Sequence, residues 1–103
     1  HITGGGFIDN IPRDLPAGLA AHISLSALAV PPVFSWLSRV GGLAEAEMLR
    51  TFNCGAGMLA VIAADEAETL VTQLGAAGET ATIIGSLVER TGEPVTFTGE
   101  LAL

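Results

Sequence analysis

The sequence predicts an α/β sandwich in which helices pack on one face of a small mixed β-sheet. Segments with helical spacing of apolar residues alternate with short apolar runs typical of strands, and turns rich in glycine or proline separate them. The chain has 103 residues, of which 50% are hydrophobic, so it is long enough to bury a core. We therefore expect one domain, or a large part of one.

The N-terminal third is expected to form a helix and then a strand. The helix is predicted over Phe7–Leu15, and Pro12 should delay or kink it because proline lacks an N–H group. Its apolar positions, spaced by three and four residues, are Ile8, Ile11 and Leu15. Pro16 and Gly18 should end the helix, and Ala20–Leu25 is predicted to be a short strand.

Two more helices are predicted before the middle of the chain. The first begins at Pro31-Pro32 and ends at Gly41-Gly42, because proline suits a first helical turn and glycine a helix end. Its expected common face consists of Val33, Phe34, Leu37 and Val40. The second helix is predicted over Ala44–Phe52, with Met48, Leu49 and Phe52 directed inward, and a tight turn over Asn53–Gly57 should follow it.

The C-terminal half is expected to supply most of the sheet. Met58–Ala63 is predicted to be a strand, and Asp65–Leu74 a helix that Asp65 caps and that Gly75 and Gly78 terminate. The expected buried stripe of this helix consists of Ala67, Leu70, Val71 and Leu74. Strands are predicted over Thr80–Val88 and Val95–Thr98, joined by a turn around Thr91-Gly92-Glu93-Pro94. The first strand of such a sandwich would precede His1, so the domain is expected to be truncated on its N-terminal side.

Composition excludes several classes of function. The net charge is −7 and the only cationic side chains are four arginines, so a nucleic-acid partner is not expected. The apolar runs are far shorter than the roughly 20 residues that span a bilayer, so no membrane segment is expected, and neither is a signal peptide. A single cysteine fits a reducing cytoplasm. With two histidines and that one cysteine, no metal site is predicted.

The glycine run at the N-terminus is the most informative segment for function. Gly4, Gly5 and Gly6 precede the first predicted helix, and backbone amides exposed in this way can bind an anion without a lysine. The same glycines can equally form nothing more than a tight turn. His1 is a candidate general acid or base, and Thr3 can donate to a phosphate or cap a turn. Each of these two residues also has a purely structural interpretation.

The first predicted helix carries two further candidates. Asn10 and Arg13 lie three residues apart, so both can face a cleft, where Arg13 would pair with a phosphate. The alternative is a solvated helix face, or an Arg13 pair with Asp9 or Asp14.

Other chemical motifs have simpler interpretations. The run from Gly55 to Ala60 matches the dinucleotide pattern G-x-G-x-x-G/A, but it is predicted to follow a helix and open a strand, which is the wrong context. A Walker loop is excluded because it needs lysine. The acids Asp65, Glu66 and Glu68 are attributed to helix capping, and His22 to structure. Cys54 is not expected to act as a nucleophile, because no histidine accompanies it at a recognisable spacing.

Taken together, the motifs resemble those of aminoimidazole ribonucleotide synthetases. His1-Ile2-Thr3-Gly4-Gly5-Gly6 and Asn10-Ile11-Pro12-Arg13 are similar to the family's runs, as are Pro31-Pro32-Val33-Phe34 and Trp36-Leu37. Glu47-Met48, Arg50-Thr51-Phe52-Asn53, Gly55 and Gly57-Met58 resemble its Glu-Met-x-Arg-Thr-Phe-Asn-Met-Gly-x-Gly-Met run. Cys54 replaces the usual methionine of that run. The similarity extends in order from His1 to about Val88.

The resemblance implies that residues 1–103 are a partial C-terminal domain of an ATP-dependent cyclo-ligase. This enzyme closes the imidazole ring of aminoimidazole ribonucleotide from formylglycinamidine ribonucleotide in purine synthesis. The resemblance implies a cytoplasmic homodimer that uses ATP and Mg²⁺, both bound by an N-terminal domain absent here. No cofactor is therefore expected in this chain, and the isolated chain is expected to be inactive.

Site roles follow from the same resemblance. Gly4, Gly5 and Gly6 would hold the phosphate of a phosphoribosyl substrate, supported by Thr3, Asn10 and Arg13. His1 would face the reacting substrate, and Asn53, Gly55 and Gly57 would line the cleft. Two alternatives remain open: a separate anion-binding or protein-interaction module, and a superfamily member with another substrate.

Overall fold

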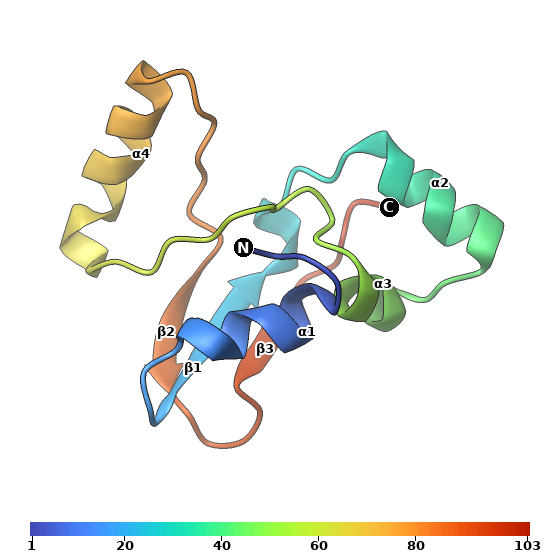
Figure 1. Cartoon of the computed structure of the whole chain (residues 1–103), viewed down its shortest axis with the longest axis horizontal. Coiled ribbons are helices and arrows are strands. Elements are labelled where there is room, and N and C mark those ends of the chain that lie inside the picture. Colours follow the sequence, from blue (N-terminus) through green and yellow to red (C-terminus); the bar gives the residue numbers. More distant parts are fainter.

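A computed structural model describes all of residues 1–103, in which short helices surround a small sheet (Figure 1). In chain order the elements are α1 (Gly6–Asn10), the 3₁₀ helix η1 (Ile11–Asp14), β1 (Leu19–Ser24), η2 (Leu25–Ala27), α2 (Pro32–Gly41), α3 (Glu45–Thr51), η3 (Ala64–Glu66), α4 (Ala67–Ala76), β2 (Gly85–Glu89) and β3 (Val95–Thr98). The molecule measures 41 × 36 × 22 Å along its principal axes. None of the helices has the length and apolar character needed to cross a membrane.

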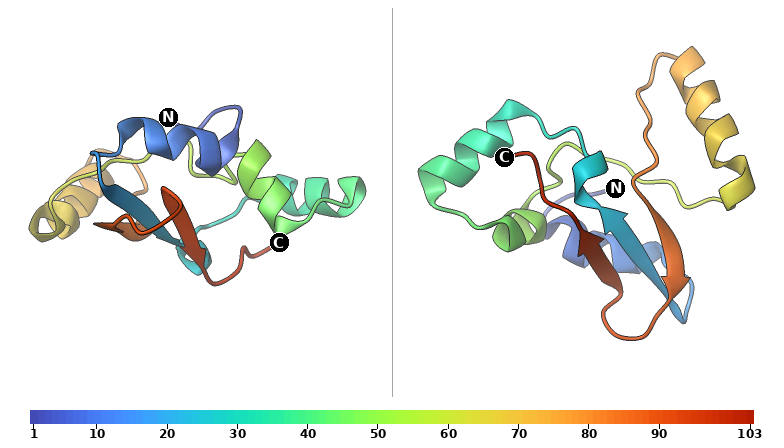
Figure 2. Two further views of the ribbon diagram at one scale, coloured as in Figure 1. Left: turned by 90° about the horizontal axis from the view of Figure 1, so that it is seen from below. Right: turned by 180° about the vertical axis from the view of Figure 1, so that it is seen from behind.

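The sheet has three strands in the order β2-β1-β3 and is mixed, as predicted. The central strand β1 is antiparallel to β2, with Ala21 opposite Leu87. It is parallel to β3, with Ile23 opposite Phe97. Figure 2 shows α1 lying across one face of this sheet. The Phe7 ring of α1 meets the Phe97 ring of β3 edge-on, with 6.2 Å between ring centroids. A helix packed on one face of a mixed sheet confirms the predicted α/β class.

The core lies between α1, α3 and the covered face of the sheet. Phe7, Leu25, Met48 and Cys54 have the largest fully buried side chains. Ala21, Ile23 and Val95 complete this core from the strands. Burial of these side chains supplies the main driving force for folding. It also fixes α1 against α3, and this contact positions the N-terminal glycine run.

The first predicted helix is broken at the predicted place. Regular α-helix ends at Asn10, and Pro12 then lies in the 3₁₀ helix η1, which ends at Asp14. The proline has no N–H to continue the α-helical ladder, so the chain tightens into 3₁₀ geometry.

Helix α2 begins and ends where predicted, but its apolar face is split. Phe34 and Leu37 are half-buried, whereas Val33 and Val40 are 53% and 68% exposed. Trp36, also 53% exposed, lies three residues after Val33 and four before Val40, so these three side chains are neighbours on the helix surface. Of the predicted face of Val33, Phe34, Leu37 and Val40, only Phe34 and Leu37 therefore pack against the core.

Helix α4 stands apart from the sheet (Figure 1), so its apolar stripe is only half-buried. The prediction that Ala67, Leu70, Val71 and Leu74 form a buried stripe is wrong for this reason. Asp65 lies in η3 and does not cap the helix, because the N-cap residue is Glu66 and it makes no side-chain capping bond. The helix continues through Gly75 to Ala76, and Gly78 follows with a φ of 90°.

Two strand predictions fail or shorten. Met58–Ala63 is not a strand, because no strand of the chain lies alongside it and its backbone groups find no ladder partner. The predicted strand over Thr80–Val88 begins only at Gly85, the residue opposite Ile23, where the chain first meets β1. The strands predicted over Ala20–Leu25 and Val95–Thr98 are present.

Candidate functional site

The glycine run forms a tight loop whose shape depends on close contact with α3. Gly5 and Gly6 have φ angles of 94° and 58°, in the left-handed region that favours glycine. A Cβ atom on Gly6 would overlap the carbonyl oxygens of Leu49 and Phe52 at the end of α3. A Cβ atom on Gly4 would meet nothing within 4 Å. Gly6 is therefore required by packing, whereas Gly4 faces open space.

Asn10 holds the loop in place from the last turn of α1. Its side chain is 4% exposed, and its Nδ2 donates to the carbonyl oxygens of Thr3 at 3.2 Å, Gly4 at 3.2 Å and Gly6 at 2.8 Å. Its Oδ1 accepts from the Thr3 hydroxyl at 3.2 Å. A single buried side chain thus ties the carbonyl groups of the glycine run together, which turns those groups away from solvent.

The amides of the loop remain largely unused. Gly6 N–H donates to the Thr3 carbonyl at 3.0 Å, but the N–H groups of Gly4 and Gly5 donate to no other group of the chain. Gly4 is exposed and Gly5 is half-buried. Preorganised N–H groups of this kind are the donors that an anion accepts from. The carboxylate of Asp9 lies against Gly5 and adds a negative charge on that side of the loop.

The Asn53–Gly57 turn lies beside the N-terminal segment, although more than 50 residues separate them. Ile2 N–H donates to the Gly57 carbonyl at 2.9 Å, and Asn53 Nδ2 donates to the Ile2 carbonyl at 3.5 Å. Asn53 Oδ1 accepts from Gly55 N–H at 2.9 Å, which closes the turn. Gly55 has a φ of 100° and packs tightly against Pro31.

The structure connects most of the predicted site residues to one another. Thr3, Gly4, Gly6, Asn10 and Arg13 share one hydrogen-bond network, which Arg13 enters through a 3.5 Å bond from its Nη1 to Asn10 Oδ1. Asn53, Gly55 and Gly57 reach this network through Ile2, which links the two segments. His1 is exposed, and its imidazole contacts none of them by a hydrogen bond.

The alternative interpretation of Arg13 as part of an ion pair is not what the structure shows. Its guanidinium bonds to Asn10, not to Asp9 or Asp14, and the side chain is exposed.

Cys54 lies in the same turn but faces the core. It is fully buried with a φ of 50°, and its Sγ lies 3.8 Å from the Met48 carbonyl oxygen. Burial raises the pKa of the Cys54 thiol, so the group stays protonated at neutral pH. His22 lies on the sheet face opposite the buried Ile23, where its Nδ1 is 2.8 Å from Thr96 Oγ1. Neither residue joins the loop.

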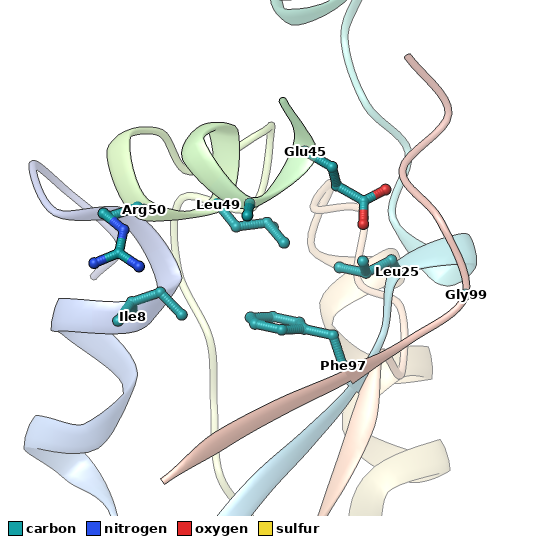
Figure 3. Close-up of a pocket in the computed structure, with 8 residues that line it drawn as sticks. Ile8, Leu25, Glu45, Leu49, Arg50, Phe97 and Gly99 are labelled. Atoms are coloured by element: carbon teal, nitrogen blue, oxygen red, sulfur yellow. The ribbon is translucent and has the colours of Figure 1, made fainter. Parts of the chain in front are cut away.

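A separate pocket of about 240 Å³ lies between α1, α3 and β3 (Figure 3). It is lined by Ile8, Leu25, Glu45, Ala46, Leu49, Arg50, Phe97 and Gly99. Glu45 Oε2 accepts from Leu101 N–H at 2.9 Å, so this carboxylate is engaged in holding the C-terminal segment. Sequence reasoning did not anticipate this pocket. The only available signal was Arg50, which belongs to the Arg-Thr-Phe-Asn run.

The chain matches a model of a known protein family. The family model described as "AIR synthase related protein, C-terminal domain" matches residues 1–97. The matched range includes the glycine loop, the Asn53–Gly57 turn and the whole sheet except the end of β3.

Proposed function

Because the chain belongs to the family of AIR synthase related protein C-terminal domains, a family of ATP-dependent enzymes, we propose that it is the C-terminal part of the ring-closing ligase of that family. The reaction would be the ATP-dependent conversion of formylglycinamidine ribonucleotide to aminoimidazole ribonucleotide. The motifs in the glycine loop and in α3 favour this substrate over others used in the superfamily. The His1–Gly6 run supports it most strongly.

The role proposed for this chain is to bind the substrate's phosphate in the glycine loop. The observation that carries the proposal is that the two N–H groups of Asn10 Nδ2 are shared among the carbonyls of Thr3, Gly4 and Gly6. With the carbonyl oxygens held on the Asn10 side, the loop can present the N–H groups of Gly4 and Gly5 to an incoming anion without carbonyl repulsion. Thr3 supports this arrangement through its hydroxyl bond to Asn10.

Charge near the loop would be set by Arg13 and Asp9. Arg13 is exposed and is connected to the loop by Asn10, so its remaining N–H groups can reach a phosphate oxygen. Asp9 lies against Gly5 and would repel the same phosphate. We therefore propose that phosphate affinity reflects a balance between these two side chains, with Arg13 the favourable member.

The remaining site residues would act on the other parts of the substrate. His1 would face the reacting atoms, where an imidazole can carry a proton or stabilise a developing oxyanion. Asn53, Gly55 and Gly57 would form the neighbouring wall, because hydrogen bonds through Ile2 place that turn beside the N-terminal segment. Fixing a substrate's phosphate between two anchored segments would hold its reacting atoms in position.

ATP and Mg²⁺ do not fit the residues of this chain. No group of three or more His, Cys, Asp or Glu side chains lies close enough to hold a metal ion. The chain also has no lysine, which a Walker loop for nucleotide phosphates requires. We propose that both cofactors bind to an N-terminal domain of a longer, cytoplasmic and homodimeric parent enzyme. ATP would there activate the substrate's amide oxygen by phosphorylation.

The test is an assay of ring closure by the parent enzyme with formylglycinamidine ribonucleotide, ATP and Mg²⁺. We expect activity from the parent and none from the 103-residue chain alone.

Replacement of His1 by Ala in the parent should depress kcat while leaving the thermal stability unchanged, because His1 is exposed and makes no side-chain hydrogen bond. Full activity of that variant would remove His1 from the mechanism. Turnover of a different phosphorylated substrate, with none of this one, would assign the chain to another branch of the superfamily.

A further inference from the structure

The pocket between α1, α3 and β3 plays no part in the proposed function (Figure 3). Its volume of about 240 Å³ is smaller than the roughly 300–1,000 Å³ of pockets for drug-sized ligands, so it suits a ligand with a single ring. None of residues 1–7 or 100–103 lines it. The N-terminal segment lies instead beside the Asn53–Gly57 turn, where Ile2 N–H donates to the Gly57 carbonyl. The pocket is therefore formed by internal residues, and neither end of the chain enters it.

The interior of the pocket is apolar. Five of its eight lining residues are hydrophobic, and two of these, Leu25 and Leu49, are almost fully buried. The Phe97 ring points into the space between α1 and α3 (Figure 3), and the Phe7 ring packs edge-on against it. Phe97 is only half-buried. A flat ring that entered the pocket would therefore contact an aromatic side chain already held in place.

Arg50 lies at one end of the pocket, beside Ile8 (Figure 3). The side chain is exposed, and its guanidinium forms no hydrogen bond or ion pair within the chain, although the sequence has 11 acids and only 4 arginines. Glu47, on the same helix, accepts instead from the Thr51 hydroxyl at 3.2 Å. A cation also suits the last turn of a helix, but that interaction leaves the guanidinium N–H groups free. These groups form a planar fork that matches a carboxylate.

Glu45 supplies the second charged group of the pocket. Its Oε2 accepts from Leu101 N–H at 2.9 Å, whereas its Oε1 accepts from no group of the chain. Glu45 precedes Arg50 by five residues on α3, which corresponds to a rise of about 7.5 Å along the helix axis. The two charges are therefore separated along the apolar interior. Glu45 repels a carboxylate and favours a hydrogen-bond donor, so the charges select one orientation of a bound ligand.

We propose that this pocket binds a small aromatic carboxylate that carries a hydrogen-bond donor at the opposite end of its ring. The carboxylate pairs with Arg50, the ring packs on Phe97, and the donor meets the free oxygen of Glu45. An apolar lining with a few placed polar groups is the usual composition of a small-molecule site. The site is separate from the glycine loop, so it does not depend on phosphate binding there.

The experiment uses 4-aminobenzoate, which carries a carboxylate and an amine at opposite ends of one ring. It is titrated into the ¹⁵N-labelled chain while the amide signals of Phe97 and Gly99 are followed. We expect saturable shifts at these two amides and none at Gly4 and Gly5. Aniline, the control without the carboxylate, should bind at least roughly tenfold more weakly, because the charge-assisted bonds to the guanidinium are lost.

Three variants locate the binding. Arg50→Gln should raise the Kd of 4-aminobenzoate by roughly tenfold, and Arg39→Gln, which removes an exposed arginine from the last turn of α2, should leave it unchanged. Ala46→Leu places a larger side chain on the pocket wall from an exposed position, so it should weaken binding without changing the circular dichroism spectrum.

The proposal is overturned if the amides of Phe97 and Gly99 do not respond in the folded chain, or if Ala46→Leu leaves the Kd unchanged. It is also overturned if aniline binds as tightly as 4-aminobenzoate, or if Arg50→Gln and Arg39→Gln have the same Kd. Either result would show that the pocket does not recognise a carboxylate.

Discussion

The side-chain nitrogen of Asn10 lies 2.8 Å from the carbonyl oxygen of Gly6, four residues before it in the chain. The same nitrogen also donates to the carbonyls of Thr3 and Gly4, so the loop and the first helix form one unit around a buried amide. The shape of the candidate phosphate site therefore depends on the identity of this residue. Its replacement is the most informative stability experiment.

Asn10→Asp should destabilise the fold by about 2–4 kcal/mol, because it removes the Asn10 donor to the carbonyls of Thr3, Gly4 and Gly6 and places a charge among them. Urea unfolding measures this change. Asn53→Asp is the matched control. Its Oδ1 would still accept from Gly55 N–H, and only a 3.5 Å bond from Nδ2 would be lost, so it should change stability by less than about 1 kcal/mol. Equal effects at the two sites would contradict the clamp assigned to Asn10.

Gly6→Ala should be strongly destabilising, by about 2–4 kcal/mol, since the new methyl group would overlap the end of α3 and φ is positive there. Gly4→Ala should be nearly neutral, because the same methyl group would meet nothing within 4 Å. Thermal unfolding of the two variants checks the pair. A tolerated Gly6→Ala would show that α1 does not pack against α3 as described.

Stability should fall at alkaline pH because of Cys54. Burial raises the pKa of its thiol in the folded chain, so the unfolded chain releases this proton first as pH rises. The contribution of Cys54 to the free energy of unfolding should be constant below the ordinary thiol pKa of about 8.5 and then decline by up to about 1.4 kcal/mol per pH unit until the folded thiol ionises. The sequence contains no tyrosine and no lysine, so no other side chain titrates strongly in this range. Cys54→Ala should remove the slope even if it lowers stability overall, and a slope that persists would contradict the assignment to Cys54.

Arg13→Gln and Asp9→Asn should change phosphate affinity in opposite directions. The first removes a cation that reaches the loop through Asn10, and the second removes a carboxylate that lies against Gly5. At low salt, Arg13→Gln should raise the Kd of ribose 5-phosphate by a factor of about 3 to 10, and Asp9→Asn should lower it by a similar factor. Both effects should be smaller at high salt. Calorimetric titration measures both. If neither substitution changes the Kd, the phosphate does not bind at this loop.

Local signals were enough to predict the class of fold and the positions of most helices. Pro12 and the Gly41-Gly42 pair mark a helix break and a helix end through backbone chemistry that does not depend on distant contacts. The hydrogen bonds from Asn10 to three loop carbonyls were not predictable in detail, because they depend on how α1 packs against α3.

The failures have a common cause in tertiary context. Met58–Ala63 has the composition of a strand, but strand structure requires a neighbour, and this chain does not provide one. Val40 has the spacing of a buried helical position, but burial requires an opposing surface, and α2 lies at the edge of the molecule. The pocket that contains Arg50 is formed by three elements distant in sequence, so no local pattern could have predicted it.

The central claim is that the glycine loop binds the substrate's phosphate, and one titration tests it most directly. Ribose 5-phosphate is added to the ¹⁵N-labelled chain while the amide signals of Gly4 and Gly5 are followed, with ribose as the uncharged control. We predict saturable shifts at these two amides with the phosphate only. Gly4→Ala should abolish them by blocking the approach, and Gly92→Ala, at another open glycine, should preserve them. A folded chain in which these amides do not respond, or respond equally in Gly4→Ala, would contradict the claim.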